Sequence, residues 1–320
     1  MLRYIIRRVL WGVALLVIVS AVVFVLFYVI PTADPAKLRA GRTANPQLVE
    51  QIRQQLHLDD PIYVQFANYM EGVFLHGDFG ESYVSQADVK DTIFERLPAT
   101  ALLVVGSVVL WLLIALPVGI ISAVRRRSLM DRTTMVTSLA FISAPVFWLG
   151  LVALYLFADD VGLIQIFPGQ GAYLTAETFP AKCWAMVLPW VVLAAATAAI
   201  YARYLRSSMI DTMAEDYIRT ARAKGLPEQK VVMKHALRSA ITPIVTLLGL
   251  DIGLLLAGNA ILTESVFNIP GIGFLIVRSI DRSDLPMIQG VVLFGAFFIV
   301  ICNLIVDILY AYLDPRVRYQ

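Results

Sequence analysis

Charged residues, cysteines and histidines are all scarce in this 320-residue chain. Charged residues make up 16% of it and hydrophobic residues 59%, whereas an average soluble domain carries roughly 25% charged residues. This composition excludes a soluble globular protein and a disordered one. The two cysteines, Cys183 and Cys302, lie far apart in apolar stretches, which excludes a disulfide scaffold. The three histidines, His57, His76 and His235, lack the spacing of metal ligands, so we predict no metal site.

Catalytic and nucleotide-binding motifs are also missing. The chain has no G-x-S-x-G or H-E-x-x-H motif, and no G-x-x-x-x-G-K-[ST] loop to hold ATP phosphates. We therefore expect it not to be an enzyme and to have no cofactor of its own. If ATP drives its activity, ATP binds to another chain. The pair Gly271 and Gly273 is too weak for a nucleotide fingerprint and is interpreted as a tight turn in an outer loop. A net charge of +2 is too small to indicate a nucleic-acid partner.

Long apolar runs, by contrast, are abundant. A helix needs about 20 apolar residues, at 1.5 Å rise each, to cross the roughly 30 Å hydrocarbon core of a bilayer. Six stretches meet this length, so we predict an all-α membrane protein with six transmembrane helices. They are residues 9–30, 101–124, 135–157, 183–201, 241–263 and 287–313. Pro117, Pro145 and Pro189 lie within these stretches, and we expect neighbouring helices to make them tolerable.

The distribution of Lys and Arg predicts the orientation. If the N-terminus is inside, the two short outer loops carry only Lys182, Arg278 and Arg282. The positive-inside rule then places both termini in the cytoplasm. The first stretch is too long for a signal peptide and is expected to remain as an anchor. The predicted parts are an N-terminal tail and first helix (1–30), an extracytoplasmic helical segment (31–96), and a five-helix core (97–320) with a cytoplasmic loop at 203–240.

The 31–96 segment carries helix-start signals of its own. Asn45-Pro46 places an N-cap residue before a proline at the first helical position, and Asp60-Pro61 repeats the arrangement. Glycines then end the second helix near Gly77-Asp78-Phe79-Gly80. A plain connection between two spans is one interpretation. The length of the segment and its helices favour contact with something outside the membrane.

The 203–240 loop has the pattern of two helices joined by a turn. Four residues at i, i+4 spacing predict one stripe of a helix that ends at Gly225-Leu226-Pro227. Three basic residues at the same spacing predict a stripe on a second short helix. The two sets are Met209, Met213, Tyr217 and Ala221, and Lys230, Lys234 and Arg238. The positive-inside rule and lipid headgroups account for the charges alone. The two helices and the turn together favour docking into a cleft of a cytoplasmic partner.

Two aspartates lie within predicted spans, where each costs roughly 2.5–3.5 kcal/mol at a helix centre. Asp307 lies near the inner end of the last span, which favours a structural role. Asp251 lies near the middle of its span, with Asn259 two turns farther along the same predicted helix. Asp251 either lines a wet translocation path or is a buried structural group. A membrane aspartyl protease is disfavoured because no glycine directly precedes Asp251.

These motifs resemble a known family: the membrane permeases of bacterial peptide ABC importers, which include dipeptide, oligopeptide and nickel permeases. The segment from Asp216 to Gly225 is similar to the family's coupling motif, in which Ala221, Gly225 and Leu237 match the general form of ABC import permeases. Similar motifs follow the family's order over residues 1–320. They are Tyr4-Ile5-Ile6-Arg7-Arg8, Gly77-Asp78-Phe79-Gly80-Glu81-Ser82, Arg96-Leu97-Pro98-Ala99-Thr100, Ser143-Ala144-Pro145-Val146-Phe147, Pro270-Gly271-Ile272-Gly273, Pro286-Met287-Ile288-Gln289-Gly290 and Leu313-Asp314-Pro315-Arg316-Val317-Arg318.

The resemblance implies a multi-pass permease of the bacterial inner membrane that alternates its access to the two sides. It implies a second, similar permease, two cytoplasmic ATPases that bind ATP and Mg²⁺, and an extracytoplasmic substrate-binding protein. The long outer segment is similar to that of the first of the family's two permease subunits. The implied sites are coupling to the ATPases at Asp216, Arg219, Ala221, Ala223, Gly225 and Leu237, the substrate pathway at Asp251 and Asn259, and binding-protein docking at Asp78, Phe79, Gly80, Gly271 and Gly273.

The substrate stays open at this point. Peptide is expected from the family, with nickel, haem and glutathione as alternatives. The family often has an uncharged polar residue near the position of Asp251, so the aspartate is a departure that favours a substrate amine or a cation. A proton-coupled transporter that uses Asp251 as its relay is a further alternative, although the six spans show no obvious repeated halves. A scaffolding membrane subunit is another.

Overall fold

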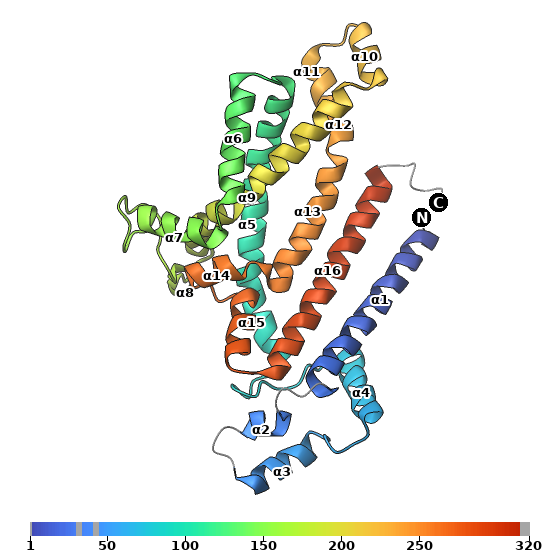
Figure 1. Cartoon of the computed structure of the whole chain (residues 1–320), viewed down its shortest axis with the longest axis vertical. Helices are drawn as coiled ribbons and strands as arrows, with labels where there is room; N and C mark the ends of the chain where they lie inside the picture. The colour runs from blue at the N-terminus through green and yellow to red at the C-terminus, as the bar shows by residue number, and fades with distance from the viewer. Residues whose placement is uncertain (1, 30–33, 41–44, 314–320) are drawn as a thin grey trace. The chain divides into compact units, whose positions relative to one another are not determined.

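The computed structural model describes residues 2–29, 34–40 and 45–313, and most of them are helical. The helices are α1 (Leu2–Phe24), α2 (Pro35–Ala40), α3 (Pro46–Gln55), α4 (Ile62–Glu71), α5 (Val89–Val124), α6 (Leu129–Ser143), α7 (Val146–Phe157), α8 (Ala172–Thr175), α9 (Phe179–Met213), α10 (Asp216–Ala223), α11 (Glu228–Lys230), α12 (Leu237–Ala240), α13 (Thr242–Leu254), α14 (Ile261–Phe267), α15 (Ile272–Asp281) and α16 (Leu285–Leu313) (Figure 1). Four π-helical segments extend or join them: η1 (Val25–Val29), η2 (Gly72–His76), η3 (Val231–Ala236) and η4 (Leu255–Asn259). The expected tail motif lies outside the described residues from position 314 onward.

Several helices are long and apolar enough to cross a membrane. Five single stretches meet that test: Ile6–Val29, Val89–Val124, Phe179–Met213, Thr242–Asn259 and Leu285–Ile308. Two further pairs, α6 with α7 and α14 with α15, meet it only as bent pairs. The described residues therefore hold between five and seven crossings. The prediction of an all-α, multi-span membrane protein is confirmed at this level.

Proline interrupts one predicted span and leaves two others intact. The prediction of one helix over 135–157 is wrong, because α6 ends at Ser143 and α7 begins after Pro145, with a bend of 100° between them. Proline has no N–H to continue the helix and disfavours the helical conformation of the preceding residue. Ala144 is accordingly extended, with φ −84° and ψ 126°. Pro117 and Pro189, as expected, lie inside α5 and α9.

A glycine ends the predicted 241–263 span early. Gly258 has φ +100°, in the left-handed region that favours glycine. Thus α13 and η4 end at Asn259, and the chain turns into α14, which is bent by 86° from α15.

The contacts divide the chain into two units. Unit 1 covers the described parts of Met1–Thr100, Gly253–Ile261 and Pro270–Leu304. Unit 2 covers the described parts of Ala101–Ile252, Leu262–Ile269 and Ile305–Gln320. The start of α5, α15 and most of α16 form the core of unit 1, whose buried residues are Val89, Ile93, Ile272, Met287, Val291 and Phe294.

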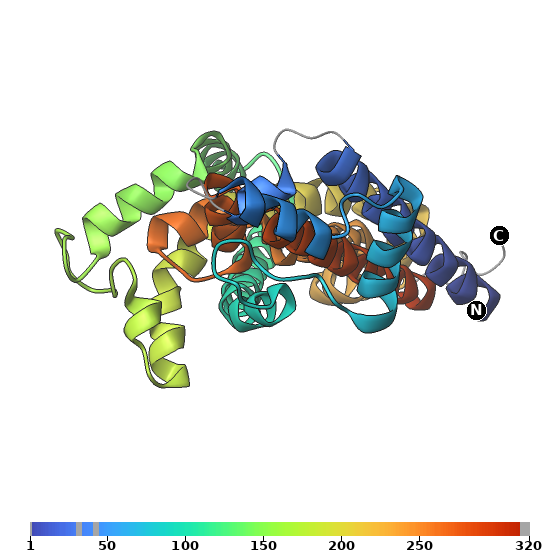
Figure 2. The same ribbon diagram turned by 90° about the horizontal axis from the view of Figure 1, so that it is seen from below.

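Helices α2, α3 and α4 lie at the C-terminal end of α1 within unit 1 (Figures 1 and 2). The Phe24 ring of α1 contacts the rings of Phe66 and Tyr69 on α4, with centroids 5.1 and 5.6 Å away. The predicted cap at Asn45 is confirmed, because its side-chain oxygen accepts a hydrogen bond of 2.7 Å from the Leu48 N–H. The predicted cap at Asp60 is wrong. Pro61 precedes Ile62, the first residue of α4, and no side chain caps that helix.

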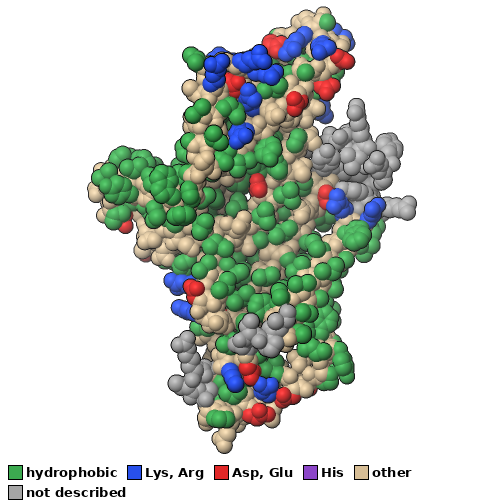
Figure 3. All heavy atoms as spheres, in the orientation of Figure 1, with side chains coloured by type: hydrophobic (Ala, Val, Ile, Leu, Met, Phe, Trp, Pro, Cys, Tyr) green, Lys and Arg blue, Asp and Glu red, His purple; other side chains and the backbone are tan. Residues whose placement is uncertain are grey.

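Unit 2 is organised around α9, against which α6, α7 and α12 pack. The Trp190 indole N–H of α9 donates a hydrogen bond of 3.0 Å to the Leu102 carbonyl of α5. Lys and Arg side chains gather at the end of this unit formed by α6, α10 and α11 (Figure 3). The membrane-spanning helices thus lead directly into a basic, polar end of unit 2.

Candidate functional site

The predicted coupling loop is a compact helical hairpin in unit 2. The prediction of one continuous helix through Met213 and Tyr217 is wrong, because α9 ends at Met213 and α10 begins at Asp216. Residue spacing alone could not find this break. The buried face of α10 is set by Ile218 and Ala221, and Tyr217 is exposed.

The hairpin has a small core of its own. Ile218 and Ala221 of α10 and Val231, Val232 and Ala236 of η3 are all buried, and α10 packs against η3. The turn at Gly225-Leu226-Pro227 is confirmed as the end of α10. Gly225 has φ +74°, and a Cβ built there meets no atom within 4 Å. Glycine is therefore favoured at this position by backbone conformation and not by lack of space.

An ion pair closes the same turn. The Arg222 guanidinium donates two hydrogen bonds to the Glu228 carboxylate, at 3.1 Å from Nε and 2.7 Å from Nη2. These bonds hold the pKa of the Glu228 carboxyl below its ordinary value. Because this bidentate pair bridges α10 and α11, it fixes the two arms of the hairpin on either side of Gly225.

Most residues predicted for coupling lie on the hairpin surface. Asp216 and Arg219 are exposed and pair at 3.3 Å, and Ala223 and Gly225 are exposed as well. Ala221 is buried under α10, and Leu237 is half-buried at the start of α12. The predicted basic stripe of Lys230, Lys234 and Arg238 is exposed along one path through α11, η3 and α12, as expected. The hairpin surface thus carries charges of both signs together with the exposed Tyr217 and Met233.

A buried ion pair ties the helices of unit 2 together beside this hairpin. The Arg206 guanidinium of α9 donates to both carboxylate oxygens of Asp131 on α6, at 2.6 and 2.8 Å. The Ser122 hydroxyl of α5 donates to the same carboxylate at 2.5 Å, and the Arg127 backbone N–H at 2.9 Å. The Asp131 side chain is 5% exposed. We call Asp131, Arg206, Ser122 and Arg127 the Asp131 cluster.

Asp251 has a partner inside unit 2. The Tyr201 hydroxyl of α9 donates a hydrogen bond of 2.6 Å to its carboxylate. The Tyr201 ring lies 5.7 Å from the Trp111 ring of α5. The Trp111 indole N–H is buried and has no hydrogen-bond partner among the described residues. Polar groups from three helices therefore meet within the apolar part of unit 2. Asn259, in unit 1, is exposed at the end of η4.

The predicted docking residues of unit 1 separate into exposed and buried sets. Asp78 and Gly80 are exposed, and Phe79 packs partly against the core of unit 1. Gly271 and Gly273 are buried, because Gly271 precedes α15 and Gly273 lies against Gly258 and Ile261. The glycine pair thus begins a helix inside the unit, and the predicted tight turn is the N-terminus of α15. Its role in docking stays a prediction.

A buried aspartate anchors the chain that follows Gly80. The Asp284 carboxylate accepts hydrogen bonds from the Ser82 hydroxyl at 2.5 Å and from the Tyr83 N–H at 3.0 Å. Asp284 immediately precedes α16 and is 4% exposed. The segment 78–83 is thereby held against the start of α16.

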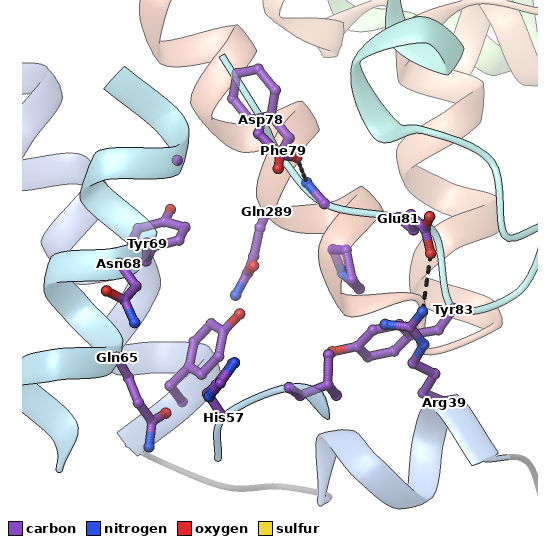
Figure 4. Close-up of a pocket in the computed structure, with 15 residues that line it drawn as sticks. Arg39, His57, Gln65, Asn68, Tyr69, Asp78, Phe79, Glu81, Tyr83 and Gln289 are labelled. Atoms are coloured by element: carbon purple, nitrogen blue, oxygen red, sulfur yellow. Dashed lines mark hydrogen bonds and ion pairs between the residues drawn. The ribbon is translucent and has the colours of Figure 1, made fainter. Parts of the chain in front are cut away.

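A pocket of about 270 Å³ lies beside this segment in unit 1 (Figure 4). Its walls come from α2, α4, the 78–83 segment and the start of α16. The Arg39 guanidinium and the Glu81 carboxylate pair at 3.0 Å on its wall. Asp78, Phe79 and Gly80, all predicted for docking, line the pocket too.

Comparison with known proteins decides the family. Residues 115–319 match the family described as binding-protein-dependent transport system inner membrane component, and residues 1–104 match the N-terminal part of the membrane component of such systems. Glutathione transport system permease proteins GsiC from Escherichia coli (strain K12) and Salmonella typhi are each 41% identical to this chain over 321 aligned residues, which cover 100% of both chains. The chain belongs to this permease family. It is an ABC importer permease and a multi-pass protein of the inner membrane.

The sequence singled out only some of the residues that organise this permease. Asp131 and Arg206 are 75 positions apart, and Ser82 and Asp284 are 202 apart, so no local pattern links them. One signal was present for Asp131: it is the only acidic residue in the run 125–132, which contains four arginines. An isolated acid among basic residues is a candidate for a buried ion pair.

Proposed function

We propose that this permease imports short peptides, including glutathione, as one of two permease subunits of an ATP-driven importer. The observation that carries the substrate class is the full-length similarity to permeases named for glutathione transport. Glutathione is itself a short peptide, so this proposal agrees with the peptide expected from the sequence motifs. Nickel and haem are the alternative substrates within the same family.

The proposed topology has six spans and both termini in the cytoplasm. The five single stretches together with the bent pair α6 and α7 give six crossings, and the bent pair α14 and α15 then forms a re-entrant element. In this topology residues 1–30 form the N-terminal tail and first span, and 31–96 lie outside the cytoplasm. Residues 97–320 form the core of five spans. The gathering of Lys and Arg around α6, α10 and α11 supports a cytoplasmic location for that end.

The hairpin of α10, α11 and η3 is the proposed contact with the ATPases, which bind ATP and Mg²⁺. Its own small core and the Arg222–Glu228 pair make it a rigid unit that moves as one piece. Asp216, Arg219, Ala223 and Gly225 offer an exposed surface to such a partner. Ala221 and Leu237 would support that surface from beneath.

The polar group around Asp251 is the proposed part of the substrate pathway. A carboxylate hydrogen-bonded to Tyr201, next to an unpaired Trp111 indole N–H, offers acceptors and a donor in an otherwise apolar region. A carboxylate favours a substrate ammonium group. Asn259 is proposed to line the same pathway, and Asp78, Phe79 and Gly80, supported by Gly271 and Gly273, to meet the substrate-binding protein.

Uptake assays test this function. Cells that lack this chain should take up labelled glutathione or labelled dipeptide only after complementation with the native chain. Uptake of nickel or haem in place of both peptides would overturn the proposed substrate class. Uptake that survives ATP depletion but stops with an uncoupler would overturn the ATP-driven mechanism in favour of a proton-coupled one.

A further inference from the structure

The pocket of unit 1 contains a side-chain amide without a protein partner. Gln289, on the first turns of α16, is 6% exposed, and the hydrogen bonds between side chains and other groups in the described part of the chain do not include its amide. Its side chain extends from α16 into the cavity (Figure 4). The cavity admits water, so the donors and acceptor of this amide are open to whatever occupies it. A ligand that enters the cavity can replace that water and bond to the amide.

Phenol groups surround this amide. Tyr28, Tyr69 and Tyr83 all line the pocket. The Tyr69 hydroxyl is buried and likewise has no partner in the described part of the chain. Burial, with a smaller contribution from nearby Tyr28, raises the pKa of Tyr69 above its ordinary value, and burial also raises that of Tyr83. These hydroxyls therefore stay protonated and can both donate and accept hydrogen bonds.

The wall of the pocket carries both signs of charge. Arg39 is paired with Glu81 through one nitrogen, so its guanidinium retains other N–H donors for a carboxylate. Glu81 and Asp78 offer carboxylates for an ammonium group. A cavity of about 270 Å³ lies just below the roughly 300–1,000 Å³ of typical small-molecule sites, so it suits a small ligand.

We propose that this pocket binds a short zwitterionic peptide. Gln289 bonds to a peptide group, Arg39 faces the terminal carboxylate, and Glu81 and Asp78 face the terminal ammonium group. An amide is both donor and acceptor, so Gln289 matches a peptide group with two hydrogen bonds. The inference rests on the proposed function and adds a site separate from Asp251 of unit 2. In the proposed topology, this site faces the side from which substrate arrives and serves as a first station for it. A loop of the substrate-binding protein also presents peptide groups and charged side chains. The experiment below distinguishes binding of a free peptide from binding of such a loop.

The test uses the complete importer reconstituted in nanodiscs without its substrate-binding protein, with labelled glutathione and labelled dialanine as probes. Gln289→Met should weaken binding of the better probe about tenfold, since loss of about 1.4 kcal/mol of hydrogen bonding is a tenfold change in Kd. Tyr69→Phe should weaken it severalfold. Two matched changes at exposed sites outside the pocket, Gln55→Met on α3 and Tyr63→Phe on α4, should leave it unchanged.

A stability readout separates ligand binding from a structural role. Without peptide, neither Gln289→Met nor Tyr69→Phe should lower the thermal midpoint of the importer, because neither change removes a hydrogen bond to another side chain or to the backbone. A lowered midpoint with unchanged peptide affinity would assign both residues to structure and overturn the proposal.

Two further outcomes would overturn it in distinguishable ways. No peptide binding by the native importer, together with weaker docking of the substrate-binding protein in Gln289→Met, would assign the pocket to a loop of that protein. Peptide transport is measured in parallel, in proteoliposomes that contain the binding protein. Transport without pocket binding would overturn the inference alone, and absence of any peptide transport would overturn the proposed function with it.

Discussion

Removing the carboxylate of the Asp131 cluster should destabilise unit 2 strongly. In Asp131→Ala the Arg206 guanidinium loses both its hydrogen bonds to the carboxylate, and the Ser122 hydroxyl and Arg127 N–H lose their acceptor. The Arg206 side chain is 22% exposed, so its charge stays largely buried without a partner. Breaking a buried pair in this way costs 3–5 kcal/mol, and the partial exposure of Arg206 places the expected loss near about 3 kcal/mol.

The loss is measurable as a lower thermal midpoint of the purified permease complex. One kcal/mol corresponds to about 2–4 °C for domains of 150–250 residues, so we expect a decrease of roughly 6–12 °C. Arg206→Met should cost a similar amount, because it leaves Asp131 as the unpaired charge. The double change Asp131→Ala with Arg206→Met should lose less than the two single changes added together, because neither charge is then left buried without its partner.

An exposed pair in the same unit supplies the control. Arg219→Met removes the Asp216–Arg219 pair, whose side chains are 96% and 70% exposed, and should leave unchanged the midpoint of the permease purified without its ATPases. If the double change at the cluster lost as much stability as the two single changes added together, the two residues would not be coupled. The reasoning from a buried, shared ion pair would then be refuted.

Three further predictions concern the hairpin and the membrane aspartate. Gly225→Asp should uncouple transport from the ATPases, whereas Gly225→Asn should keep more activity because asparagine tolerates φ +74° better; equal transport by both variants and the native chain would contradict a role for the turn. The hydrogen bonds from Arg222 lower the pKa of Glu228 in the folded state. The pair therefore stabilises the hairpin fully above the ordinary glutamate pKa of about 4.3, and this stabilisation is lost as the pH falls through the lower pKa of the folded state. The protection of residues 216–236 against amide exchange, corrected for the intrinsic rate at each pH, should fall there in the native protein but show no such step in Glu228→Gln, and identical profiles would count against the pair. Asp251→Asn should reduce transport more than it reduces thermal stability, because asparagine can still accept the Tyr201 hydrogen bond; unchanged uptake of every peptide tested would return Asp251 to a structural role.

Local signals predicted the features that depend on neighbours in sequence. The long apolar runs identified the spans, Asn45 identified its cap, and Gly225-Leu226-Pro227 identified the end of α10. Each of these depends on a few consecutive residues, whose conformational preferences act without the rest of the fold.

Features that depend on distant partners could not be predicted in this way. Pro145 breaks a helix whereas Pro189 does not, and the two residues differ in their surroundings and not in their own chemistry. The Asp131–Arg206 and Tyr201–Asp251 contacts join different helices, and they become visible only when those helices are packed. Gln289 was predicted only as part of a motif, because the cavity that its side chain lines is a property of the fold.

The length of α9 gives it a mechanical property. Its 35 residues span about 52 Å at 1.5 Å each, well beyond the roughly 30 Å hydrocarbon core. Tyr201, Arg206 and the point where the hairpin attaches therefore lie on one stiff rod, with Tyr201 about 18 Å from Met213 along its axis. In the proposed coupling, a displacement of the Met213 end of α9 is therefore carried along one helix to the hydrogen bond at Asp251 and to the Asp131 cluster.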